Sequence, residues 1–390
     1  MKISEDIRLE LRKFVAPEYI FGIDARKMAA NYCKKLGAER VFIATDKNLR
    51  KSQWFIELEN SLQTARIESV VFDNISPNPR DYEVIEGAEN YNQNKCNIII
   101  AIGGGSVMDC AKGIGIVVTN NKHIHYFEGI DKIEKPTPPL ICIPTTAGTS
   151  ADVSQFAIIN NTTDKYKMAI ISKALVPDVA LIDPFVLQSM DNYLTACTGM
   201  DALCHAFEAF VSNANSAFTD LFALEAIRLL HENLIINIQS PNNIQARGKT
   251  MLGSLYAGLA FSNASLGCVH SMAHSLGGYL DLPHGECNAI LLPHVVDFNY
   301  KSAIERYRKI AETLEISTSG STESDVKKTL INYLFNLKKN LDITHSLKDK
   351  NVTTDIIPSL AKKAIKDPCN ATNPKAPHVK DLELIYNEAL

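Results

Sequence analysis

No CxxC pair occurs in the sequence, and its nine cysteines are an odd number. This pattern fits reduced thiols better than a disulfide framework, so we expect a cytoplasmic protein. No apolar run approaches the roughly 20 residues of a membrane span. The charged N-terminal segment MKISEDIRLELRKF also lacks the apolar core of a signal peptide. A net charge of −4, without a clustered basic stripe, argues against a nucleic-acid partner. We therefore expect neither a membrane nor a nucleic acid among the partners.

The composition is that of an ordinary soluble globular protein. Of the 390 residues, 46% are hydrophobic and 22% are charged. A chain of this length can bury a large core and is expected to divide into two domains. We find no internal repeat and no low-complexity segment.

The first half of the chain alternates short β-branched or aromatic runs with amphipathic segments. The expected strands are 19–21, 40–45, 67–72, 97–102, 139–143, 155–160 and 178–182. Helical segments at 25–35, 52–64 and 81–92 lie between several of them. Alternation of this kind predicts an α/β domain with a parallel sheet that helices cover on both faces.

The pattern changes after Asp183 and Pro184. The runs 191–212, 217–237, 243–263, 266–279, 302–313, 323–339, 354–365 and 380–389 all have helical periodicity, and no clear strand run follows. We therefore place a domain boundary near residue 185. Residues 1–185 would form the α/β domain and residues 186–390 an all-helical domain.

One carboxylate and four histidines in the second half have spacings that suit a metal site. Asp201 and His205 are four residues apart, His270 and His274 repeat that spacing, and His284 follows on a Leu-Pro-His-Gly turn. Three imidazoles with one carboxylate suit Fe(II) or Zn(II) better than Ca(II) or Mg(II), which prefer oxygen ligands. A cation held in this way can polarise an oxygen atom, so the pattern predicts a metal-dependent enzyme.

That interpretation competes with a structural one. A lone histidine such as His231 is usually a surface or hydrogen-bonded residue. Two pairs at four-residue spacing, with a fifth member nearby, are harder to explain as chance clustering. Residue type and spacing alone leave open which of the four histidines bind.

A glycine-rich segment, AIGGGSVMDCAKGIG from Ala101 to Gly115, follows a strand and leads into a helix. Its three adjacent glycines allow positive φ and a close backbone approach, and the helix N-terminus offers N–H groups to an anion. Ser106 adds a hydroxyl, and a pyrophosphate is the natural guest. The usual GxGxxG fingerprint is absent, however, and a structural tight turn would have the same sequence.

Two further segments point to a dinucleotide. Asp46 ends a buried strand, where a carboxylate can accept hydrogen bonds from an adenosine ribose and favour NAD over NADP. It could equally cap the following turn. The hydroxyl-rich segment from Ile143 to Ser150 follows another strand and could line a phosphate or ribose, or form an ordinary polar turn.

Taken together, these motifs resemble the iron-containing, or group III, alcohol dehydrogenase family over nearly the whole chain. The matching segments are PNP at 77–79, GGGSxxDxAK at 103–112, PTTAGT at 144–149, DP at 183–184, TGMDALxHAxEA at 198–209, FSN at 261–263, HxMAHxLG at 270–277, PHG at 283–285, NAILLPHV at 288–295 and ATNPK at 371–375. The pair formed by TGMDALxH and HxMAH…PHG is highly specific to that family.

The resemblance implies roles for individual residues. The implied metal ligands are Asp201, His205, His270 and His284, and His274 would lie beside the nicotinamide and assist proton movement. Gly104, Gly105, Ser106 and Asp109 match the pyrophosphate-binding turn, Asp46 matches the position that favours NAD, and Thr145, Thr146, Thr149 and Lys167 match cofactor-contacting positions. Phe261 matches an aromatic residue that borders the substrate pocket. Proteins similar to this one are usually homodimers or larger homo-oligomers.

The chain departs from the family pattern in the loop after Thr149. Asp152 stands where the family commonly has Glu, and Phe156 falls where the pocket wall often varies. Phe156, Ile158 and Phe261 suggest a small apolar substrate. This loop and the FVAPEYIFG segment near the N-terminus resemble a subgroup named alcohol dehydrogenase-like regulatory proteins.

We therefore expect an alcohol dehydrogenase that interconverts a small primary alcohol and its aldehyde with NAD. We expect Fe(II) as its metal, with Zn(II) as a competitor because Zn(II) binds such sites more tightly. A regulatory or sensor protein on the same scaffold is the alternative from another class. A related lyase or glycerol dehydrogenase is disfavoured by the set of one aspartate and three histidines.

Overall fold

The first half of the chain is built on a parallel β-sheet. The computed structural model describes residues 11–390, so residues 1–10 of the predicted N-terminal domain lie outside the described residues. Six strands pair in the order β1-β9-β6-β4-β2-β3, and every neighbouring pair is parallel. They are β1 (Glu18–Phe21), β2 (Arg40–Ala44), β3 (Glu68–Phe72), β4 (Ile98–Gly103), β6 (Leu140–Pro144) and β9 (Val179–Ile182). The prediction of a parallel sheet is confirmed.

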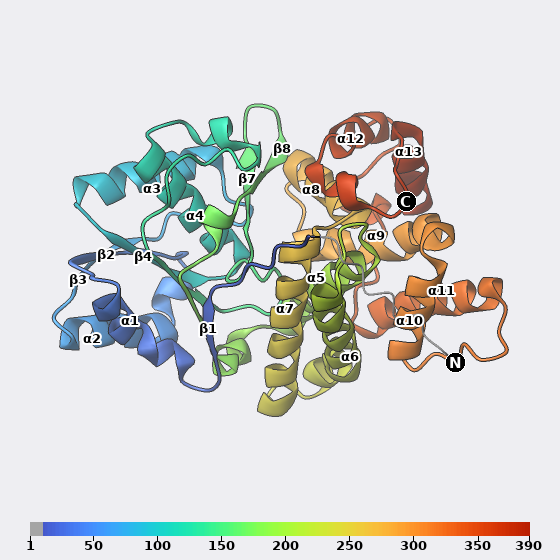
Figure 1. Ribbon diagram of the computed structural model, residues 1–390, viewed down its shortest axis with the longest axis horizontal. Coiled ribbons are helices and arrows are strands. Elements are labelled where there is room, and N and C mark those ends of the chain that lie inside the picture. Colours follow the sequence, from blue (N-terminus) through green and yellow to red (C-terminus); the bar gives the residue numbers. More distant parts are fainter. Residues whose placement is uncertain (1–10) are drawn as a thin grey trace.

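Helices cover both faces of this sheet, because alternate strand side chains point to opposite sides. Val41 and Ile43 of β2 belong to a core on the side of α1 and α2, whereas Phe42 and Ala44 belong to a core on the side of α3 and α4. These helices are α1 (Ala29–Lys35), α2 (Gln53–Thr64), α3 (Asp81–Gln93) and α4 (Gly105–Asn120). Figure 1 shows the two helix pairs on opposite sides of the strands.

The sequence patterns miss part of a second, smaller sheet. Its three strands are β5 (Gly129–Ile130), β8 (Tyr166–Ile171) and β7 (Phe156–Asn161), with β7 and β8 antiparallel. Only β7 was predicted. A buried lysine, Lys167, interrupts the apolar pattern of β8, and β5 has too few residues to give a periodic signal. One face of this sheet looks toward the helical half of the molecule.

From residue 192 to residue 390 the described chain forms helices and contains no strand. The helices are α5 (Asn192–Val211), α6 (Ala217–Gln239), α7 (Ile244–Ala264), α8 (Cys268–Leu280), α9 (His284–Asn299), α10 (Ile304–Thr313), α11 (Glu323–Asn340), α12 (Ile357–Ala364) and α13 (Val379–Glu388). The all-helical prediction is confirmed, but α9 was missed because Pro283 precedes it and Pro293 lies inside it. No described helix is by itself long and apolar enough to cross a membrane; α7 and α8 pass that test only as a pair, which is bent by 100°.

The two halves meet where α8 packs against β8, in the upper middle of Figure 1. A Cβ atom on Gly278 would lie 2.4 Å from the Cα atom of Tyr166, so only glycine allows this backbone contact. Lys363 of α12 also donates hydrogen bonds to the carbonyls of Asp164 (2.9 Å) and Lys165 (2.8 Å) in the β7–β8 turn. These contacts fix the distance between the sheet and the helix that carries His270 and His274.

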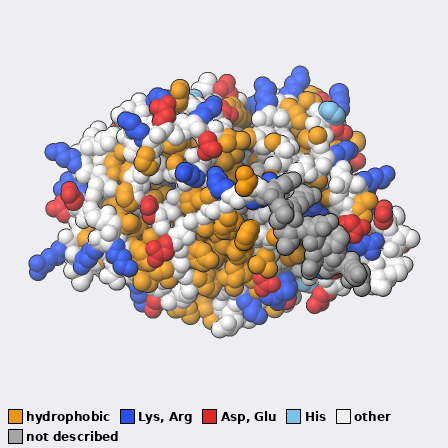
Figure 2. Space-filling model, viewed as in Figure 1, with side chains coloured by type: hydrophobic (Ala, Val, Ile, Leu, Met, Phe, Trp, Pro, Cys, Tyr) orange, Lys and Arg blue, Asp and Glu red, His pale blue; other side chains and the backbone are white. Residues whose placement is uncertain are grey.

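One face of the molecule exposes an apolar area. Figure 2 shows hydrophobic side chains gathered in the middle of this face, where β1 and α7 lie in Figure 1. Tyr19 and Phe21 of the edge strand β1 are partly exposed, and so is the following Ile23. Phe218 and Leu221 of α6 are also exposed. An edge strand with exposed apolar side chains is a surface that a partner chain commonly covers.

Candidate metal centre and cofactor cleft

Three helices bring the predicted metal-binding side chains together. Asp201 lies on α5, His270 lies on α8, and His284 is the first residue of α9. The Nε2 atoms of His270 and His284 lie 3.6 and 3.7 Å from Oδ1 of Asp201. The donor atoms of the three residues all lie within 4.8 Å of one another. The group therefore has the size needed to surround one ion.

His205 lies just outside this tightest group of three. It follows Asp201 by one turn of α5, and its Nε2 atom lies 3.9 Å from Asp201 Oδ1. Its ring stacks on those of His270 and Phe261, with centroids 4.4 and 4.3 Å apart. Ring stacking therefore holds His205 beside the group of Asp201, His270 and His284, with its Nε2 atom near Asp201 Oδ1.

A buried carboxylate that the sequence analysis did not select orients His270. Oε2 of Glu208 lies 2.5 Å from Nδ1 of His270, and Oε1 accepts a 2.7 Å hydrogen bond from the Val269 backbone N–H. Because the Glu208 carboxylate accepts the Nδ1 proton, Nε2 is the nitrogen of His270 that faces Asp201 and that would bind a metal once it has lost its proton. This is the orientation of a metal-ligating imidazole.

Asn288 is a second residue that the sequence analysis missed. It lies one turn after His284 on α9, and its amide nitrogen is 2.6 Å from Asp201 Oδ1. The same nitrogen lies 3.1 and 3.3 Å from the Nε2 atoms of His270 and His284. It thus lies near the point where the three donor atoms converge, while its buried amide oxygen has no hydrogen-bond partner.

The electrostatics of the cluster favour a cation. Burial would raise the pKa of Asp201, but His205, His284 and His270 lower it well below its usual value. Burial lowers the pKa of His205 to about 3 and that of His284 well below its ordinary range. For His270, burial would lower the pKa, but Glu208 and Asp201 raise it to about 9. Two buried carboxylates and mostly neutral imidazoles, with no described Lys or Arg bonded to Asp201, fit a divalent metal ion.

The predicted phosphate-binding turn lies where β4 ends and α4 begins. Gly104 precedes the helix, and the N–H groups of Gly105 and Ser106 open its first turn, where intrahelical partners are lacking. None of these three glycines uses the positive φ that glycine allows. The backbone of Gly105 does come close to another part of the protein, because a Cβ atom on Gly105 would lie 2.5 Å from Oγ1 of Thr149. The turn therefore packs tightly beneath the threonine loop.

The threonine loop lines one side of this turn. The Thr145 backbone N–H donates a 2.9 Å hydrogen bond to the Gly103 carbonyl, and the Thr146 side chain lies 3.4 Å from the position of a Cβ atom on Gly104. Thr145 is buried, whereas Thr149 reaches the pocket described below. The glycine turn and the threonine loop thus lie side by side at the carboxyl edge of the parallel sheet.

Asp46 stands one strand further along this edge, outside the pocket. Its Oδ1 atom accepts 2.9 Å hydrogen bonds from the backbone N–H groups of Asn48 and Leu49. The capping role that the sequence left open is therefore present. One carboxylate oxygen is used in this way, and the other oxygen has no hydrogen bond among the described residues.

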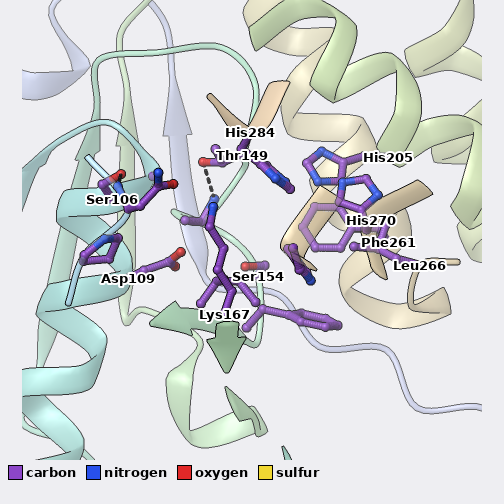
Figure 3. A pocket seen from close by; sticks show the side chains of 17 residues that line it. Ser106, Asp109, Thr149, Ser154, Lys167, His205, Phe261, Leu266, His270 and His284 are labelled. Carbon is purple, nitrogen blue, oxygen red and sulfur yellow. Dashed lines mark hydrogen bonds between the residues drawn. The ribbon is translucent and has the colours of Figure 1, made fainter. Parts of the chain in front are cut away.

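A single pocket joins the metal group to the cofactor turn (Figure 3). From the first half of the chain it is lined by Ser106, Asp109, Thr149, Phe156, Ile158 and Lys167, and from the second half by His205, Phe261, His270, His274 and His284. Its cavity volume is about 90 Å³, which suits a small molecule. Burial raises the pKa of Asp109 to about 7. Burial also lowers the pKa of Lys167, whose ammonium group has no hydrogen bond or ion pair with any described residue.

Each of the three residues that the sequence analysis missed contacts a predicted site residue. Glu208 and Asp367 do so at Nδ1 of a histidine, and Asn288 does so at the donor atoms themselves. Glu208 and Asn288 had a recognisable signal, because each lies one helical turn from a histidine of the metal group. Asp367, which contacts Nδ1 of His274 at 2.8 Å, had none, because 93 residues separate the two in sequence.

Comparisons with known proteins agree with this geometry. Residues 16–184 match the model of iron-containing alcohol dehydrogenases, and residues 195–390 match the C-terminal model of the Fe-containing alcohol dehydrogenase family. The chain belongs to the iron-containing alcohol dehydrogenase family. It is accordingly an oxidoreductase that acts on alcohols.

Curated and solved members of this family resemble the chain over almost its full length. A 1,3-propanediol dehydrogenase of Citrobacter freundii is 38% identical over 95% of this chain and 96% of its own. An NAD-dependent methanol dehydrogenase of Bacillus methanolicus is 35% identical over 97% of this chain and 99% of its own. The crystal structure of a 1,3-propanediol oxidoreductase has a TM-score of 0.94 and 36% identity, covering 98% of this chain and 100% of that one.

Proposed function

We propose that this family member interconverts small primary alcohols and their aldehydes, with NAD as hydride carrier and Fe(II) held by Asp201, His205, His270 and His284. The observation that carries the proposal is that the metal group and the cofactor turn open onto one pocket. Relatives named for methanol and 1,3-propanediol support a short alcohol, and one named as NAD-dependent supports the cofactor.

The residues of the chain divide the work of the reaction. When bound, the metal supplies Lewis acidity at the alcohol oxygen and the nicotinamide accepts the hydride. Oxidation also releases one proton from the hydroxyl, and His274 is the pocket residue suited to accept it. Ser106, Thr149 and Lys167 would hold the cofactor phosphates and ribose, and Asp46 would accept hydrogen bonds from the adenosine ribose through its free oxygen.

The pocket wall favours a short carbon chain. Phe156 and Phe261 meet edge to face with centroids 5.6 Å apart, and both are nearly fully buried. With Ile158 they form an apolar end to a small cavity, which would exclude long or polar substrates.

The Phe156→Ala variant tests this assignment. Removing the ring opens the pocket wall, so we expect the ratio of kcat/KM for hexanol to that for ethanol to rise about ten-fold. The rise comes from the apolar contacts that the additional methylene groups of hexanol can then make. Steady-state NADH formation across a series of linear alcohols measures the ratio. Phe335→Ala is the matched control, because Phe335 is 38% exposed on α11 and outside the pocket. An unchanged ratio, or a polyol as the best wild-type substrate, would contradict the proposal.

The molecular context follows from the same features. We propose a cytoplasmic enzyme, in line with nine cysteines that are all free and buried. We also propose a homodimer or larger homo-oligomer in which the exposed side chains of β1 and α6 are covered. The domain boundary near residue 185 is proposed on the change from strands to helices, between β9 and α5.

A further inference from the structure

His274 has a buried carboxylate partner of its own. Its Nδ1 atom lies 2.8 Å from Oδ2 of Asp367, and the two side chains are only 4% and 6% exposed. The other oxygen of Asp367, Oδ1, accepts a 2.8 Å hydrogen bond from the backbone N–H of Cys369. Asp367 is the N-cap of the 3-10 helix Pro368–Thr372, so its position is set by the backbone.

Helix α8 therefore carries two carboxylate–histidine pairs, one turn apart. His270 pairs with Glu208 of α5, and His274 pairs with Asp367 near the C-terminus of the chain. The first pair directs Nε2 of its imidazole toward Asp201. The second pair has the same arrangement at Nδ1, but its ring stacks on that of His284, with centroids 5.2 Å apart and planes 14° from parallel.

The surroundings of Asp367 favour a positioning role over a second metal site. His274, Asp367 and Cys369 lie close enough to hold an ion. However, one carboxylate oxygen of Asp367 accepts from the Cys369 N–H and the other faces Nδ1 of His274, and burial raises the pKa of the Cys369 thiol well above its ordinary value. A protonated thiol is a poor metal ligand.

His274 also has space on its far side. It lines both the catalytic pocket and a second polar cavity of about 450 Å³, which Asp367, Lys366 and Glu128 also line. An imidazole between two cavities can turn toward either one unless something holds it. The hydrogen bond to Asp367 supplies that restraint.

We propose that Asp367 is a positioning residue that holds His274 as the Nδ1–H tautomer, so that the lone pair of Nε2 remains free for the hydroxyl proton of the substrate. The catalytic consequence rests on the proposed function, whereas the tautomer itself does not. Asp367 touches neither substrate nor metal in this account, and it acts only through His274.

The Asp367→Asn variant tests the proposal directly. Because Oδ1 accepts from Cys369 N–H, the asparagine oxygen is expected to take that place and to turn its NH₂ group toward His274 Nδ1. The imidazole must then accept at Nδ1 and carry its proton on Nε2. Nitrogen NMR of histidine-labelled, zinc-loaded protein reads the tautomer, and Zn(II) is chosen because it is diamagnetic. We expect Nδ1–H in the wild type, Nε2–H in the variant, and a fall in kcat of about a hundred-fold.

Glu208→Gln is the matched comparison, since it makes the same change behind His270. It should weaken metal affinity by about 10–100-fold, whereas Asp367→Asn should leave the metal content unchanged. An Nε2–H tautomer in the wild type would overturn the proposal even if the variant did not fold. An unchanged tautomer or kcat in a folded Asp367→Asn protein would overturn it as well. A wild type that oxidises no alcohol but shows the expected tautomers would refute the proposed function and leave the positioning role standing.

Discussion

The His270→Ala variant is expected to lose its metal and at least a thousand-fold in kcat/KM. His270 is the central member of the metal group: its Nε2 atom lies 3.6 Å from Asp201 Oδ1, and Glu208 fixes its tautomer from behind. Removing a ligand weakens metal binding. Loss of the cation would cost several kcal/mol of stabilisation of developing negative charge, or on the order of a thousand-fold in rate. The substitution also leaves Glu208 without the imidazole it contacts.

Metal content by elemental analysis and steady-state turnover are the two measurements. His231→Ala serves as the control, because His231 contacts Tyr333 at 2.7 Å and lies outside the pocket. The control should keep both metal and activity. A His270→Ala protein with full metal content and undiminished kcat/KM would show that this imidazole is not a ligand.

The Gly278→Ala variant is expected to be destabilised by about 3 kcal/mol or more and to lose activity. The added Cβ atom would lie 2.4 Å from the Tyr166 Cα atom and 2.7 Å from the Lys167 backbone nitrogen. Backbone atoms in a paired strand cannot rotate away as a side chain can, so α8 must move from β8. Overpacking of this kind costs about 1–3 kcal/mol and occasionally more. Because α8 also carries His270 and His274, the same displacement would disturb the catalytic pocket.

Gly248→Ala provides a matched control in another helix. Its nearest neighbour would be Pro184 Cβ at 3.8 Å, an ordinary contact, so alanine should be neutral or stabilise the protein by up to about 1 kcal/mol. Denaturant unfolding of the two variants compares them directly. Equal free energies of unfolding for the two would contradict the assigned contact.

Much of the fold could be predicted because its signals are local. The strands of the parallel sheet are continuous apolar runs, and most C-terminal helices have clear periodicity. Helix α9 was missed because Pro293 lies inside it, and β8 because Lys167 interrupts its pattern. In both cases tertiary packing overrides a local preference that the sequence expresses plainly.

The site likewise contains residues with a local sequence signal and residues without one. Residue type and spacing indicate a metal site among Asp201 and the four histidines, and the family resemblance selects Asp201, His205, His270 and His284. The structure brings these four side chains together. The assignment of the glycines to a cofactor turn stays a prediction. In the structure Gly105 makes room for Thr149 without a positive φ. The contact between Asp367 and His274 depends on how the end of the chain folds back onto α8, which no spacing along the sequence encodes.

The most direct test of the account is NADH formation from a short primary alcohol by protein that has been stripped of metal and then reloaded anaerobically. Turnover should vanish on stripping and return with Fe(II). Zn(II) is expected to bind but to support less turnover, because affinity and catalytic competence differ. Undiminished turnover in the stripped protein would contradict the central claim that the cluster around Asp201 holds the catalytic metal.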